Sequence, residues 1–202
     1  GAKVAAIEAD AVVLDDRARI AADAIVAGIG AVPAVELARA AGLGLDNGIA
    51  CDGAMRTSDP SIFAAGDCCS FPHPLYDGRR IRLEAWRSAQ DQAAIAARNM
   101  LGHGVAYDAV PWFWSDQFDL SLQIAGLPGE EASHAVRPLK DGAFIRFHLD
   151  AAGRLVGASG IGPGNTVARD IRLAEMLIGK RAAPAPGVLA DPNVPLKSLL
   201  VT

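Results

Sequence analysis

The sequence has few cysteines and no long apolar run, and both absences narrow its function. Cys51, Cys68 and Cys69 are its only cysteines, which is neither a disulfide framework nor a metal-binding spacing. The longest apolar stretch, residues 24–35, is too short to span a bilayer and contains glycine and proline. The first residues show no signal-peptide pattern. We therefore expect a soluble protein of the reducing cytoplasm, with no membrane association.

The sequence also lacks an excess of positive charge and any cluster of metal ligands. Its net charge of −4 argues against a general nucleic-acid binder, which must neutralise phosphates. The four histidines are scattered without ligand spacing, and we expect surface or loop positions for them: His73, His103, His134 and His148. We assign no metal site and no catalytic side chain.

A third absence is the glycine fingerprint of dinucleotide-binding turns. The pattern G-x-G-x-x-G does not occur, since the segment from Gly28 through Gly30 continues into Pro33. A lone Gly-x-Gly is weak evidence, and a structural turn is its ordinary interpretation.

Hydrophobic periodicity and turn residues predict the elements. We expect strands at 4–8, 11–14, 24–27, 62–65, 145–149 and 154–159, and an aromatic strand pair within 107–127. We expect helices at 35–41, with Leu37 and Ala41 on one face, at 87–101 and at 165–178, the first two ended by Gly42 and Gly102. Residues 71–82 are expected to form a polar loop, and the proline-rich tail 183–202 to lie extended on the surface.

The most informative stretch runs from Arg56 to Asp67. The expected strand 62–65 leads into Gly66, which allows close backbone approach to a ligand, and then into Asp67. Open α/β sheets bind cofactors at the carboxyl ends of their strands. Because Gly-Asp is also a common turn, these two residues alone leave a structural interpretation open.

The whole string 56–67 resembles the second flavin-binding motif of the pyridine-nucleotide-dependent flavoprotein reductases. Three further strings narrow the resemblance: Arg82 to Ala93, Pro111 to Gln117, and Val194 to Leu199. Together they resemble the FAD-dependent NAD(P)H:ferredoxin reductases that serve cytochrome P450 and ring-hydroxylating dioxygenase systems. The resemblance covers roughly residues 10–200.

The resemblance implies an oxidoreductase that transfers electrons from NADH through FAD to a [2Fe–2S] ferredoxin. The implied fold is α/β and α+β: the second half of a FAD/NAD(P)-binding Rossmann-like domain and a small mixed carboxyl-terminal reductase domain. The implied division is 1–33 for the end of the NAD domain, 34–104 for the FAD domain and 105–202 for the reductase domain. Both glycine fingerprints of the family are missing, so we expect a fragment that is inactive and colourless alone. A homo-oligomer is left open.

The resemblance also implies cofactor contacts. Asp67 would accept a hydrogen bond from a ribityl hydroxyl of FAD, with Gly66 and the backbone of Cys68 beside it. Gly30 lies in the segment that returns from the NAD domain to the FAD domain, and Glu84 is a candidate for positioning the nicotinamide amide.

Ala85 and Trp86 precede the predicted helix 87–101. Backbone N–H groups at a helix start favour negative charge, such as that of a reduced flavin. An ordinary helix start with a half-buried tryptophan is the alternative.

Arg79, Arg80, Arg82 and Arg87 place four positive charges within nine positions. Ferredoxins are typically acidic, and complementary charge speeds encounter. We expect Arg79, Arg80 and Arg82, with Trp114, to form the docking and electron-transfer face. A solvated loop is the alternative.

Two other functions stay open. An NADH oxidase or peroxidase would pass electrons to oxygen species, and a flavin-free interaction domain would have no cofactor. The adjacent cysteines 68 and 69 could bridge only through a strained ring, so we expect no redox role for them.

Overall fold

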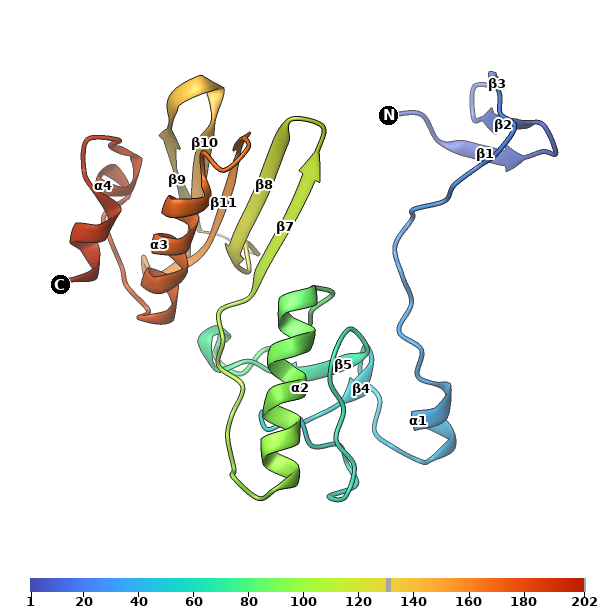
Figure 1. Cartoon of the computed structure of the whole chain (residues 1–202), viewed down its shortest axis with the longest axis horizontal. Coiled ribbons are helices and arrows are strands. Elements are labelled where there is room, and N and C mark those ends of the chain that lie inside the picture. The colour runs from blue at the N-terminus through green and yellow to red at the C-terminus, as the bar shows by residue number, and fades with distance from the viewer. Residues whose placement is uncertain (130–131, 202) are drawn as a thin grey trace. The chain divides into compact units, whose positions relative to one another are not determined.

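The computed structural model describes residues 1–129 and 132–201, which form two compact units, Gly1–Val32 and Pro33–Thr202 (Figure 1). The first unit is a three-stranded antiparallel sheet with the order β1-β2-β3. Its strands are β1 (Val4–Ile7), β2 (Ala11–Leu14) and β3 (Arg19–Ala21). The predicted strand at 24–27 is wrong, because these residues have no sheet partner and no regular structure.

The second unit begins with a small sheet and two helices. Its elements are α1 (Glu36–Ala40), β4 (Ile49–Ala50), β5 (Cys69–Pro72), a 3₁₀ helix at Pro74–Tyr76, β6 (Arg80–Arg82) and α2 (Trp86–Met100). β4 pairs parallel with β5, and β5 pairs antiparallel with β6. Met55, Cys69, Phe71 and Tyr107 are among the side chains that form the core of this part.

Both predicted helices of this part are present. α2 begins one residue earlier than predicted, and Gly102 closes it in the left-handed conformation at φ +84°. α1 is shorter than predicted and buries Ala38, whereas Leu37 is 89% exposed. The predicted apolar face of α1 is therefore wrong.

Two other predictions for this part are wrong. Residues 62–65 form no strand: their backbone has one isolated bridge, between Arg56 and Phe63, because no neighbouring strand extends it. Residues 71–82 are not an irregular loop, since β5, the 3₁₀ helix and β6 form a hairpin. The prolines of this hairpin lie at the end of β5 and at the first position of the 3₁₀ helix, where a missing N–H is tolerated.

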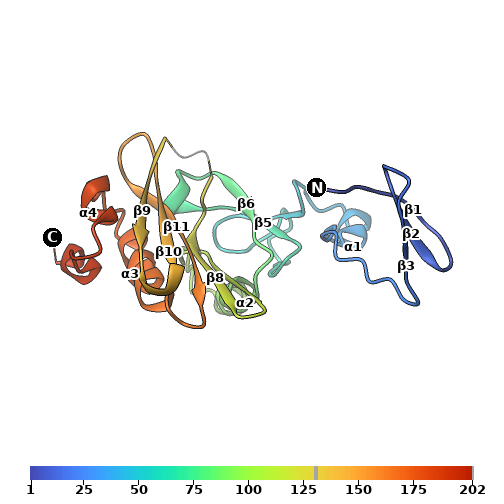
Figure 2. The ribbon, with the colours of Figure 1, turned by 90° about the horizontal axis from the view of Figure 1, so that it is seen from above.

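The rest of the second unit is a five-stranded antiparallel sheet with the order β7-β8-β11-β10-β9. Its elements are β7 (Trp112–Gln117), β8 (Leu120–Gly126), β9 (Ser133–Pro138), a 3₁₀ helix at Lys140–Gly142, β10 (Phe144–Leu149), β11 (Leu155–Pro163), α3 (Ala168–Gly179), α4 (Pro186–Ala190) and a 3₁₀ helix at Leu196–Leu200. α3 packs against β8 and β11, and Figure 2 shows these strands side by side.

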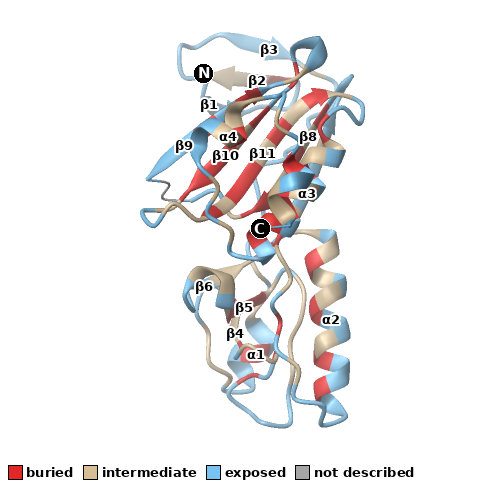
Figure 3. Ribbon diagram, turned by 90° about the vertical axis from the view of Figure 1, so that its left-hand side faces the viewer, coloured by how far each residue is buried: buried red, intermediate tan, exposed pale blue. Residues whose placement is uncertain are grey.

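The core between the sheet and α3 follows the predicted periodicities. Every second residue of β10, beginning at Ile145, is buried, and so are Ile171, Ala174 and Ile178 of α3 (Figure 3). The strand pair, the strands around 145–159 and the helix predicted at 165–178 are thus confirmed. β9 was not predicted.

The extended tail predicted for 183–202 is wrong. It contains α4 and a 3₁₀ helix, and its Leu189 and Leu196 are buried in the core of the sheet. Thr202 lies outside the described residues. Arg137 of β9 is itself buried and donates from Nε to the Leu189 carbonyl at 2.8 Å and from Nη2 to the Val194 carbonyl at 3.1 Å. In the part of the chain that the structure describes, no helix has the length and apolar character needed to cross a membrane.

Candidate functional site

The Gly66–Asp67 turn lies immediately before β5 and not, as expected, at the carboxyl end of a strand. Gly66 has φ +90°, a left-handed conformation that favours glycine. The Asp67 side chain is exposed, and no described residue hydrogen-bonds to its carboxylate. The turn therefore presents a free acceptor beside a backbone that a ligand can approach closely.

A side chain from α2 holds this turn. The Gly66 N–H donates to Oε1 of Gln92 at 2.8 Å, and Gln92 donates from Nε2 to Oγ of Ser88 at 2.9 Å. The Ser88 hydroxyl in turn lies 3.2 Å from the Tyr107 hydroxyl. Because Gln92 and Ser88 are both buried, each polar atom needs such a partner. Sequence reasoning missed this chain, although two polar residues four positions apart on the inner face of a helix could have indicated it.

Arg82 joins the turn to the segment that leads into α2. Its Nη1 donates to the Asp67 carbonyl at 3.1 Å and to Oε1 of Glu84 at 2.5 Å. Its Nε is buried and has no hydrogen-bond partner among the described residues. The structure thus brings together Asp67 and Glu84, which the sequence placed seventeen positions apart.

α2 begins at this cluster without a capping side chain. Ala85 is the N-cap residue in an extended conformation, and its side chain has no oxygen to accept from the first N–H groups of the helix. Trp86 is the first helical residue. A pocket of about 220 Å³ borders this start; its lining includes Arg82, Glu84, Ala85, Trp112, Phe113 and Ile124.

Trp114 of β7 meets Trp86 of α2. The two rings form an edge contact with centroids 6.5 Å apart, and Trp112 stacks on Trp114 at 5.3 Å. Trp86 is 65% exposed and Trp114 is 40% exposed. This contact joins the start of α2 to the first strand of the five-stranded sheet.

The predicted docking arginines differ in their partners. Nη1 of Arg80 donates to the Ser70 carbonyl at 2.6 Å and to the Cys51 carbonyl at 3.0 Å, and its Nε lies 3.3 Å from a carboxylate oxygen of Asp46. Arg82 is held as described above. Arg79 is exposed, with its guanidinium 5.6 Å from the ring centre of Tyr76. Two of the three guanidinium groups therefore hold backbone carbonyls.

Gly30 and Cys68 are the remaining predicted cofactor residues. Gly30 is exposed and lies in the first unit, so the structure does not relate it to the turn. The Cys68 carbonyl accepts from Ile49 N–H at 2.7 Å and so belongs to the small sheet.

The cysteines pair differently from their order in the sequence. The Cys51 thiol lies 3.7 Å from the Ile49 carbonyl, and the Cys69 thiol lies 4.0 Å from Sδ of Met55. The neighbouring Cys69 thiol lowers the pKa of Cys51, whereas the Cys51 thiol and burial raise the pKa of Cys69. Both are buried, and all three cysteines are free thiols.

The expectation of surface or loop positions is wrong for His148, whereas His73 lies in a loop but is buried. His73 is fully buried between β5 and the chain that leads to β7, and His148 is buried in β10. Nε2 of His73 lies 3.0 Å from the Ala109 carbonyl, and Nε2 of His148 lies 3.1 Å from Oγ of Ser159. These long-range partners cannot be read from the spacing of the histidines in the sequence.

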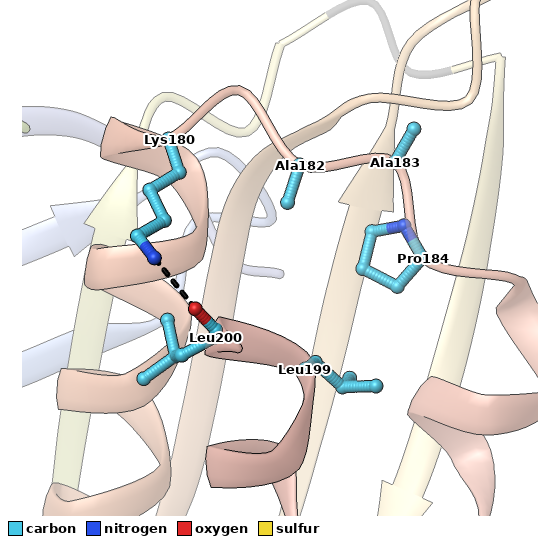
Figure 4. A pocket seen from close by; sticks show the side chains of 6 residues that line it. All are labelled: Lys180, Ala182, Ala183, Pro184, Leu199 and Leu200. Carbon is cyan, nitrogen blue, oxygen red and sulfur yellow. Dashed lines mark hydrogen bonds between the residues drawn. The ribbon is translucent and has the colours of Figure 1, made fainter. Parts of the chain in front are cut away.

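A pocket of about 620 Å³ lies at the carboxyl-terminal segment. Lys180, Ala182, Ala183, Pro184, Leu199 and Leu200 line it, and Nζ of Lys180 donates to the Leu200 carbonyl at 2.6 Å (Figure 4). Lys180, the only titratable residue of this lining, is thus hydrogen-bonded within the chain. None of the predicted site residues lines the pocket.

Two protein-family models match successive parts of the chain. Residues 1–93 match the pyridine nucleotide-disulphide oxidoreductase family, and residues 112–200 match the reductase C-terminal family. The chain is 46% identical over 198 residues to the ferredoxin–NAD(+) reductase component of the anthranilate 1,2-dioxygenase system of Burkholderia cepacia, covering 97% of this chain and 47% of the relative. It is 38% identical over 193 residues to putidaredoxin reductase of Pseudomonas putida, covering 94% and 44%.

Among solved structures, the covalent putidaredoxin reductase–putidaredoxin complex matches with a TM-score of 0.90 at 34% identity, over 100% of this chain and 49% of that chain. The chain belongs to the ferredoxin reductase family. The chain spans about half the length of the curated relatives it matches. The expected mixed α/β fold, related to the FAD- and NAD-binding reductases, is confirmed.

Proposed function

We propose that this chain is part of a flavoprotein that transfers electrons from NADH through FAD to a [2Fe–2S] ferredoxin. The ferredoxin would belong to a cytochrome P450 or ring-hydroxylating dioxygenase system. The observation that carries the proposal is the Arg82 bridge, which joins the Asp67 turn and Glu84 at the uncapped start of α2. Relatives named as ferredoxin reductases support the same function.

The residues present fit FAD. The free carboxylate of Asp67 suits a ribityl hydroxyl, and the uncapped N–H groups of α2 suit an anionic ring edge. The buried Nε of Arg82 has no acceptor among the described residues, which is unfavourable unless another group supplies one. Bound FAD would supply the conversion of a two-electron hydride donor into single-electron transfers.

Each site residue has a separate task in this proposal. Gly66 lets the backbone approach the cofactor, and Asp67 accepts from it, with the backbone of Cys68 beside them. Ala85 and Trp86 provide the N–H groups that favour negative charge, Glu84 orients the nicotinamide amide, and Gly30 lies on the return path between the two cofactor domains.

The ferredoxin would dock at Arg79, Arg80, Arg82 and Trp114. Positive charge favours encounter with an acidic partner, and the partly exposed Trp114 offers an aromatic contact. We also propose the domain division 1–33, 34–104 and 105–202 and a cytoplasmic location.

The test is a hybrid in which this chain replaces the matching half of the B. cepacia reductase. We expect the hybrid to bind FAD and to reduce its ferredoxin with NADH. Arg79→Glu should slow ferredoxin reduction roughly tenfold at low ionic strength, because one docking charge is reversed without removing a bond to a backbone carbonyl. Steady-state rates at two salt concentrations measure the effect.

Ferricyanide reduction is the control, since a small acceptor does not need the docking face. Equal losses with ferredoxin and ferricyanide would refute docking at Arg79. A hybrid that reduces oxygen faster than ferredoxin would refute the proposed acceptor.

A further inference from the structure

All three tryptophans of the chain form one connected group, the tryptophan ladder, consisting of Trp86, Trp114 and Trp112. The first contact is edge-to-face, with an interplanar angle of 89°, and the second is stacked, with an angle of 25°. The ladder thus runs from the start of α2 into β7, which is the edge strand of its sheet. An edge strand has hydrogen-bonded backbone on one side only, so a second contact is needed to hold its side chains in place.

Arg87 provides that contact. Its guanidinium lies 5.8 Å from the ring centre of Trp112. Over an aromatic face, a guanidinium both stacks and attracts the ring quadrupole. Such a contact depends on the orientation of the guanidinium plane, and therefore on what fixes that plane.

Glu175 of α3 fixes the plane of the Arg87 guanidinium. Its side chain is only 6% exposed, and it accepts from Nη2 of Arg87 at 2.5 Å and from Nη1 of Arg172 at 2.6 Å. The hydrogen bond to Glu175 is the main cause that raises the pKa of Arg87. A carboxylate buried to this extent is costly even when it is paired, and packing alone would be served better by an apolar side chain.

We propose that Glu175 is a positioning residue for electron transfer: through Arg87 it fixes Trp112, and the stacked ring of Trp112 holds Trp114 in its edge contact with Trp86. The proposal rests on the proposed function, in which the ladder begins at the flavin site and reaches the docking face at Trp114. Loosening the ladder should slow transfer to a protein acceptor and spare a small acceptor that reaches the flavin directly.

The first measurement uses the 202-residue chain without cofactor. Because every tryptophan belongs to the ladder, the indole bands in near-ultraviolet circular dichroism report the ladder alone. Glu175→Gln should weaken these bands and shift tryptophan emission to longer wavelength, with the far-ultraviolet spectrum unchanged. Unchanged indole bands would refute the positioning role.

Asp91→Asn is the matched control, since it neutralises the other carboxylate facing Arg87, an exposed group 3.8 Å away. It should leave the indole bands as they are. If both substitutions weaken the bands equally, the effect is one of net charge on Arg87, and the specific role of Glu175 is wrong.

Arg87→Lys keeps the proposal testable if Glu175→Gln does not fold. It preserves the charge partner of the buried carboxylate and removes the planar group above Trp112. We expect a folded protein with weakened indole bands; intact bands would refute the role of the guanidinium plane.

The second measurement uses the hybrid reductase described above. Glu175→Gln should lower the rate of ferredoxin reduction roughly tenfold, which corresponds to about 1.4 kcal/mol in the activation barrier. It should leave the rate of ferricyanide reduction unchanged. An unsubstituted hybrid that reduces neither acceptor refutes the proposed function. An active hybrid whose ferredoxin rate is insensitive to Glu175→Gln refutes only this inference.

Discussion

At the scale of single residues, His73 and Tyr76 help to hold together the part of the second unit around α2, each through two hydrogen bonds to the backbone. His73 accepts from the Leu75 N–H at Nδ1 at 3.2 Å, so its proton lies on Nε2, which donates to the Ala109 carbonyl at 3.0 Å. The Tyr76 hydroxyl accepts from the Leu127 N–H at 2.9 Å, and burial raises its pKa to about 12. These bonds connect the hairpin of β5 and β6 to the chain just before β7 and just after β8, at the same end of that antiparallel pair.

His73 predicts a pH dependence of stability. Burial lowers its pKa below the ordinary value. Below about pH 6.5 the unfolded chain therefore binds a proton that the folded chain refuses. The free energy of unfolding should fall as the pH drops from about 6.5 toward the lowered pKa, and be independent of this group above that window. Urea unfolding at several pH values between 5 and 8 measures it.

His73→Asn is the matched variant for this prediction, because its side-chain oxygen can still accept from the Leu75 N–H. It should be less stable at pH 8 by roughly 1–3 kcal/mol, since the Ala109 carbonyl loses its donor. Its stability should also vary less between pH 5 and 7. An equal pH slope in both proteins would show that another group causes the dependence.

At the scale of elements, the last segment of the chain is part of the core. α4 places Leu189 among the side chains of the five-stranded sheet, and Arg137 of β9 binds the carbonyls of the same segment. Desolvation lowers the pKa of Arg137, so its three carbonyl acceptors compensate a real cost of burial. The tail therefore completes the sheet domain.

Leu189→Ala tests this role of α4. We expect the free energy of unfolding to fall by about 2–5 kcal/mol, the range for a fully buried leucine that leaves a cavity. Val201→Ala, at an exposed position, should change it by less than about 0.5 kcal/mol. Chemical denaturation of the two variants measures the difference. Equal small effects would mean that the tail is only loosely attached.

At the scale of the whole molecule, the chain contains one part of the proposed flavin site. Asp67, Arg82 and Glu84 lie together, but the chain spans about half the length of the relatives it matches. No glycine fingerprint for a dinucleotide occurs in it. This chain offers a few hydrogen bonds at the proposed site, which is few for a cofactor as large as FAD.

We therefore expect the purified 202-residue chain to be colourless. Added FAD should produce no bound flavin spectrum after gel filtration, whereas the hybrid reductase should be yellow. The absorbance spectrum of each protein after desalting is the measurement. A yellow sample of the chain alone would show that its contacts suffice for FAD.

The sequence by itself determined those features that have a local physical cause. Strand alternation at 145–149, the helical spacing of α3 and the glycine that ends α2 follow from backbone geometry, and all three are present in the structure. The strings around Asp67 and Trp114 likewise indicated the family before any contact was known.

The tertiary structure alone decided which residues meet. Gln92 holds Gly66 across 26 positions, and Glu175 holds Arg87 across 88. No periodicity encodes such pairs, because they arise only when helices pack against other elements and buried polar atoms find partners. For the same reason the arginines of β6 looked like free charges in the sequence, and the structure shows Arg80 and Arg82 bonded to backbone carbonyls.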